Sequence, residues 1–159
     1  MVVPNKVDKR GEKTMICPRN IYVEAKYYYE AAHMMEDSRE EGKLFPPIIM
    51  NAAFACELYS KAILYHEDAD EESLRTHGLK DLYEKIPCNI KTLIIDGYKN
   101  SAETRFEKFI DDINDIFEFW RYRYEYKEYS AHYSFVLDYM DILNMVTTNM
   151  FDGEIECDK

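Results

Sequence analysis

The sequence predicts an all-α protein: a bundle of four long helices, with short helices between the second and the third. Two observations carry this prediction. Apolar residues recur every three or four positions through most of the chain, which is the period of a helix. Glycine and proline interrupt none of these periodic segments and fall at the joints between them. These residues are Gly11, Gly42, Gly78, Gly97, Gly153, Pro4, Pro18, Pro46, Pro47 and Pro87.

The length of the chain predicts one domain. It has 159 residues, of which 47% are apolar, enough to build one hydrophobic core. We expect a flexible N-terminal arm over 1–17, a single helical domain over 18–151 and an acidic C-terminal tail over 152–159.

The first two long helices have different apolar patterns. The first is expected from about 19 to 41, with one stripe formed by Ile21, Ala25 and Tyr28. The second begins at Pro46 and Pro47, because proline suits the first turn of a helix, and reaches about residue 65. It is apolar nearly all round, which predicts a central position.

Short helices are expected over 78–86 and from Pro87 to about Gly97. The third long helix follows, with Ser101 as its N-cap. The last is expected over about 130–150. The apolar stripe of the third helix consists of Phe106, Phe109, Ile110, Ile113, Ile116, Phe117 and Trp120. That of the last consists of Val136, Met140, Leu143 and Met150.

The charge of the chain limits its partners. The net charge is −11, which argues against general nucleic-acid affinity and against docking on anionic membranes. The longest apolar run contains Asn51, Glu57 and Lys61, so it predicts a buried helix and no membrane span. The N-terminus lacks the apolar region of a secretion signal. We therefore expect a cytoplasmic protein.

The cysteines and histidines predict no metal site and no cofactor. Cys17, Cys56, Cys88 and Cys157 have no zinc-type spacing and are expected to be reduced thiols. The histidines never stand four residues apart, as they do on a zinc-binding helix. His132 falls in the first turn of the last helix, where it is either a local hydrogen-bonding residue or an acid–base group.

Glu57 and Lys61 are the only charged residues in the second helix, and their spacing of four lets them pair on one face. Two interpretations stay open. The pair is either a structural ion pair at the rim of the core, or a polar spot at a groove or subunit contact.

An aromatic and basic run ends the third helix. Its candidate binding residues are Trp120, Arg121, Tyr122, Arg123 and Tyr124. Such side chains can stack on bases. However, 118–129 holds three basic and three acidic residues, so its net charge is zero. Phosphate binding needs positive charge, which favours a structural role or protein contact over RNA.

Three stretches together resemble the HEPN-domain family: NAAFACELYSKAILY, THGLKDLYEKIP and FEFWRYRYE. Their elements are the small-residue helix with Glu57 and Lys61, the H-x-L-x-x-L pattern of His77, and the W-R-Y-x-Y-E run. The resemblance covers about 20–145. It implies an all-α bundle, frequent homodimers, and roles in RNA cleavage, toxin–antitoxin pairs or phage and stress defence.

Catalytic HEPN members carry R-x(4–6)-H near the start of the last helix. Here ten residues separate Arg121 from His132, and eight separate Arg123 from His132. We therefore expect no enzyme, but a non-catalytic binding module that acts as a homodimer or with a protein partner, in a defence, toxin–antitoxin or mobile-element system. One alternative is a ribonuclease with an aberrant site built from these three residues. The other is an acidic decoy that inhibits a nucleic-acid-binding protein.

Overall fold

The computed structural model describes residues 16–38, 45–98, 103–125 and 133–152. All regular structure in these ranges is helical, and they contain no strand, so the all-α prediction is confirmed for them. The elements are α1 (Pro18–Asp37), α2 (Phe45–His66), α3 (Leu79–Lys85), α4 (Cys88–Gly97), α5 (Glu103–Asp112), α6 (Ile116–Arg121), the 3₁₀ helix η1 (Arg123–Glu125) and α7 (Tyr133–Phe151).

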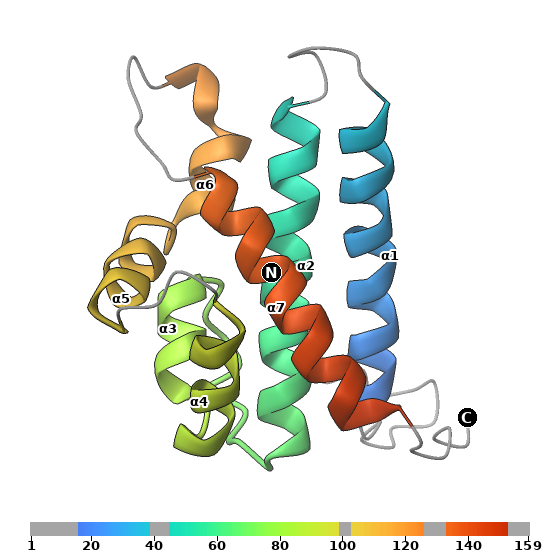
Figure 1. The fold of residues 1–159 in the computed structure, drawn as a ribbon, viewed down its shortest axis with the longest axis vertical. Coiled ribbons are helices and arrows are strands. Elements are labelled where there is room, and N and C mark those ends of the chain that lie inside the picture. The colour runs from blue at the N-terminus through green and yellow to red at the C-terminus, as the bar shows by residue number, and fades with distance from the viewer. Residues whose placement is uncertain (1–15, 39–44, 99–102, 126–132, 153–159) are drawn as a thin grey trace.

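Helix α2 is the centre of the fold, as its apolar sequence predicts. It packs against α1 on one side and against α3 and α6 on the other, and α7 crosses it obliquely (Figure 1). Ile49, Cys56, Tyr59 and Ile63 on this helix are completely buried. A helix with neighbours on several sides must be apolar on several faces, which explains its composition.

The prediction of a third long helix is wrong, because that part of the chain forms two shorter helices, α5 and α6. A turn at 113–115 separates them. The turn has a role: the backbone carbonyl of Asn114 accepts a hydrogen bond from the Leu79 amide at 3.2 Å. The side-chain oxygen of Asn114 also accepts from the amides of Lys80 and Asp81, at 2.9 and 3.2 Å. Asn114 therefore satisfies amides in the first turn of α3, which have no partner inside that helix.

The apolar stripe survives this break. Phe106, Ile110, Ile113 and Ile116 are all at most 2% exposed. The turn keeps these side chains facing the core, so periodicity alone cannot reveal it. The described long helices are therefore α1, α2 and α7, while α5 and α6 have 10 and 6 residues. The bundle of four long helices is corrected accordingly.

The expectation of reduced thiols is wrong at one position. Cys17, immediately before α1, is disulfide-bonded. Cys56 and Cys88 are free, the first buried and the second exposed. Cys157 lies outside the described residues. Spacing could not predict a bridge at Cys17, because disulfides join residues that the fold brings together.

Within the described ranges, no helix combines the length and apolarity that crossing a membrane would require. The expectations for Ser101 and for His132 fall outside those ranges, as do residues 1–15 of the arm expected over 1–17 and residues 153–159 of the expected C-terminal tail.

Candidate functional site

A buried ion pair lies on α2. Lys61 donates from Nζ to Oε1 of Glu57 at 2.8 Å, and their side chains are only 7% and 5% exposed. The two residues stand one helical turn apart, which brings their side chains onto one face. Burying an isolated charge is costly, so each member of the pair makes the burial of the other tolerable.

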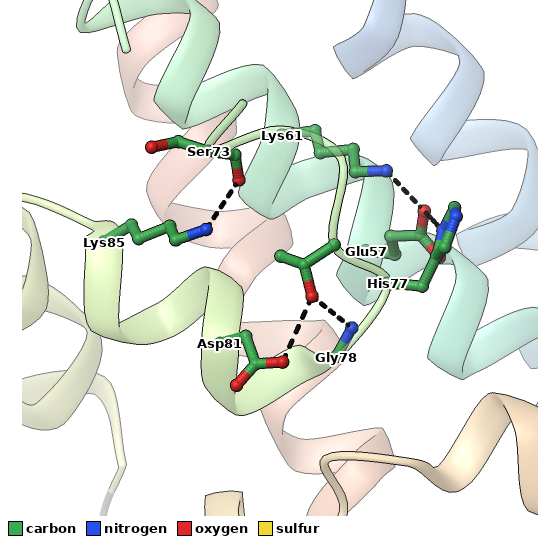
Figure 2. Close-up of polar contacts among 8 residues, drawn as sticks. Glu57, Lys61, Ser73, His77, Gly78, Asp81 and Lys85 are labelled. Atoms are coloured by element: carbon green, nitrogen blue, oxygen red, sulfur yellow. Dashed lines mark hydrogen bonds and ion pairs between the residues drawn. The ribbon is translucent and has the colours of Figure 1, made fainter. Parts of the chain in front are cut away.

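His77 is the third member of this cluster. Its Nδ1 lies 2.8 Å from the same Oε1 of Glu57. Figure 2 shows the side chains of Lys61 and His77 both pointing toward the Glu57 carboxylate. An ionised carboxylate only accepts hydrogen bonds, so Nδ1 of His77 must carry the hydrogen. The contact ties the loop before α3 to α2. The histidine side chain is 41% exposed, which places the cluster at the surface edge of the core.

Short-range contacts hold the loop that carries His77. The Thr76 hydroxyl donates to Oδ2 of Asp81 at 3.1 Å and accepts from the Gly78 amide at 3.2 Å. Lys85 donates from Nζ to the Ser73 carbonyl at 3.1 Å, farther back in the same loop (Figure 2). The chain is thus anchored on both sides of His77, which fixes where its ring can lie.

Gly78 is needed for close packing and not for an unusual backbone angle, since its φ is −69°. A Cβ there would lie 2.5 Å from Oδ2 of Asp81 and 2.6 Å from Oδ1 of Asn114. Both oxygens already accept hydrogen bonds that build this corner. A side chain at this position would push Asn114 away from the start of α3.

A groove of about 570 Å³ opens over the buried cluster. Glu57 and Lys61 lie on its α2 side, and α6 with the turn before it forms the opposite side. Partly buried apolar side chains from both helices face it. Its lining residues are Phe54, Glu57, Leu58, Lys61, Thr76, His77, Gly78, Asp81, Asn114, Asp115, Phe117, Glu118, Arg121 and Tyr122.

The groove brings together four of the residues that the sequence singled out. All four line it: Glu57 and Lys61 come from α2, Arg121 is the last residue of α6, and Tyr122 follows it. The guanidinium carbon of Arg121 lies 5.5 Å from the centre of the Tyr122 ring, which is cation–π distance.

The other three predicted binding residues lie elsewhere. Trp120 is 8% exposed and packs in the core, with its ring centre 5.7 Å from that of Phe45 and 5.4 Å from that of Tyr133. Arg123 covers the Trp120 ring at 5.0 Å. Tyr124 is 81% exposed and does not line the groove.

The alternative nuclease site combines Arg121 and Arg123, which the structure describes, with His132, which it does not. Arg121 and Arg123 have the aromatic neighbours just given, and His132 lies outside the described residues. Over those same ranges, no three His, Cys, Asp or Glu side chains are grouped so as to hold a metal ion.

Ten of the fourteen lining residues were not predicted as site residues, among them His77, Asn114, Asp115 and Glu118. His77 stands 20 positions after Glu57, and Asn114 lies more than 30 positions after the amides that it caps. Local patterns do not report such distant pairs. The one available signal was the H-x-L-x-x-L pattern, whose Leu79 and Leu82 are indeed buried.

No protein-family model, curated protein or solved structure matches this chain.

Proposed function

We propose that this chain is a non-catalytic, HEPN-like helical module that works by binding a protein partner, and that the groove between α2 and α6 is its binding surface. The biological setting that we propose is a defence, toxin–antitoxin or mobile-element system. The resemblance to HEPN domains motivates the family and the setting, and the groove supports the mode of action.

The observation that carries this proposal is the composition of the groove. Its base is a buried and compensated ion pair, held by Glu57, Lys61 and His77. Its sides offer aromatic and aliphatic surface from Phe54, Phe117 and other partly buried residues. Apolar surface beside oriented polar groups is the usual composition of a protein-binding surface.

A catalytic role has less support. Lys61 and His77 both contact Oε1 of Glu57, so the polar groups at the base are engaged with each other. A nuclease needs a histidine placed for proton transfer and a cation placed on the phosphate. Four carboxylates in the lining would also repel that phosphate.

The test is affinity capture from the source cells, followed by mass spectrometry. The bait is the wild type, Tyr122→Ala or Tyr124→Ala. The two tyrosines stand two residues apart, but only Tyr122 lines the groove. We expect the wild type and Tyr124→Ala to retain the same partner and Tyr122→Ala to lose most of it. Equal capture by all three baits would contradict the proposed surface.

The ribonuclease alternative is tested in parallel with purified protein and single-stranded RNA. We expect no cleavage above background. Cleavage that Arg123→Ala and His132→Ala both abolish would establish the alternative in place of the binding module.

A homodimer remains a prediction from the family resemblance. Light scattering that gives the monomer mass up to high micromolar concentration would contradict it.

A further inference from the structure

We infer that the groove between α2 and α6 receives a basic segment of the partner protein, in which Lys or Arg side chains alternate with apolar ones. This inference rests on the proposed function and adds the chemistry of the partner. It combines three properties of the groove: its charge, the position of that charge and its apolar sides.

The formal charge of the lining is negative. Four carboxylates and two side-chain cations line the groove, which gives −2 with His77 neutral. A second cavity, of about 670 Å³ between α3, α4 and α5, shows that this is not general: three lysines balance three carboxylates in its lining. The groove between α2 and α6 therefore carries an excess of negative charge that the second cavity lacks.

The carboxylates available to a partner lie on the rim. Glu57 is buried and already holds Lys61 and His77, so its charge is compensated at the base. Asp115 and Glu118 are exposed on the α6 side, and Asp81 is exposed at the start of α3. Arg121 is also exposed on the α6 side, so the rim carries three carboxylates and one guanidinium. A cation that approaches the groove meets this net negative charge before it reaches Lys61, and an anion is repelled by it.

The sides of the groove supply the apolar part of the recognition. Phe54, Leu58 and Phe117 are only partly buried, although Leu58 and Phe117 pack against the core. The Phe54 and Phe117 rings lie 5.9 Å apart between centres, one from α2 and one from α6. An apolar side chain that covered them would remove this surface from water, which favours binding. A simple inorganic cation would leave it exposed, so a peptide with both kinds of side chain fits better.

The probe for this inference is a pair of tetrapeptides, acetyl-Leu-Arg-Phe-Arg-amide and acetyl-Leu-Glu-Phe-Glu-amide. Each is titrated into the full-length ¹⁵N-labelled chain to about 5 mM, a range that detects weak binding. Backbone amide shifts report where each peptide binds. We expect the basic peptide to move signals around the groove, including those of Thr76, Glu118 and Tyr122. We expect the acidic peptide to leave them in place.

A charge-matched pair of variants tests the role of the rim. Asp115→Asn with Glu118→Gln removes two rim charges. Glu24→Gln with Asp96→Asn removes two exposed charges outside the groove lining, so both variants have the same net charge. At low salt, we expect the rim variant to bind the basic peptide about threefold or more weakly than the wild type does. The control variant should lose less than about twofold in affinity for that peptide.

The peptide titrations would overturn the inference if they gave equal shifts with both peptides, shifts outside the groove, no shift at the highest concentration, or equal weakening by the two variants. Groove shifts on adding a short oligouridylate would indicate RNA instead. Groove shifts on diluting the protein alone would indicate a second copy. Capture of a partner whose contact segment is not basic would overturn this inference and leave the protein-binding function intact. Failure of the affinity capture to retain any partner would count against the proposed protein-binding function and not against the preference for a basic peptide.

Discussion

Removing one member of the buried ion pair should destabilise the fold strongly. Lys61→Met keeps the length and apolar stem of the side chain but leaves the Glu57 carboxylate buried without its nearest cation, 2.8 Å away. Breaking a buried pair in this way costs about 3–5 kcal/mol, because the remaining charge has lost its solvent and its partner. For a chain of this length, that loss corresponds to a fall in melting temperature of about 6–20 °C.

The reasoning also predicts that removing both charges costs much less. In the double variant Glu57→Gln with Lys61→Met, no charge remains to be buried, and the glutamine oxygen can still accept from His77. We expect the double variant to recover most of the stability that Lys61→Met loses. An exposed pair provides the control: Lys80 and Asp111 lie 2.7 Å apart, with side chains 36% and 62% exposed. Lys80→Met should therefore have little effect.

The assay is thermal and urea unfolding, followed by circular dichroism. The urea slope should be the same in all variants, so that shifts of the midpoint report stability. A loss below about 1 kcal/mol for Lys61→Met would refute the argument, since it would mean that water solvates Glu57. A double variant less stable than Lys61→Met would refute it as well.

Further predictions concern the corner around α3, the contact between α1 and α7, and the disulfide. Gly78→Ala and Asn114→Ala should each cost about 1 kcal/mol in urea unfolding, and together less than the sum, because both remove the same cap; additive losses would contradict this. His33 bonds Asp141 across the two helices at 2.8 Å. Burial lowers the pKa of His33, but the Asp141 hydrogen bond and nearby carboxylates give a net increase. The wild type should therefore exceed His33→Gln in free energy of unfolding by more at about pH 5.5 than at about pH 8.5. A larger difference at about pH 8.5 would contradict this prediction. Cys17→Ser should abolish the two-hydrogen mass difference between oxidised and reduced protein.

Much of the fold follows from local patterns. The apolar periodicity predicted α1, α2 and α7, and Pro46 and Pro47 correctly marked the first turn of α2. These features depend on residues close together in the sequence, which is why a single sequence reveals them.

The break between α5 and α6 is a different case. Ile113 and Ile116 continue the buried stripe across it, so the pattern predicted one helix. The turn exists because Asn114 caps a helix that begins more than 30 positions earlier. An interaction between distant segments leaves no period in the sequence.

The candidate site was predictable only in part. The charges of Glu57 and Lys61 were noticeable because the rest of α2 is apolar, and their pairing followed from their spacing. Their contact with His77 depends on how the loop before α3 folds back on α2. Trp120 and Tyr122 were both predicted as binding residues, but only Tyr122 lines the groove, whereas Trp120 packs in the core.

The central claim is that a protein partner contacts this chain through the groove between α2 and α6. The most direct test replaces Tyr122 or Tyr124 with the photo-crosslinking residue p-benzoylphenylalanine in the source cells. The side chains of both tyrosines reach the surface, with exposures of 36% and 81%, but only Tyr122 lines the groove. We predict a covalent adduct with one protein at position 122 and none, or much less, at the more exposed position 124. An adduct mainly at 124, or none at 122, would contradict the claim.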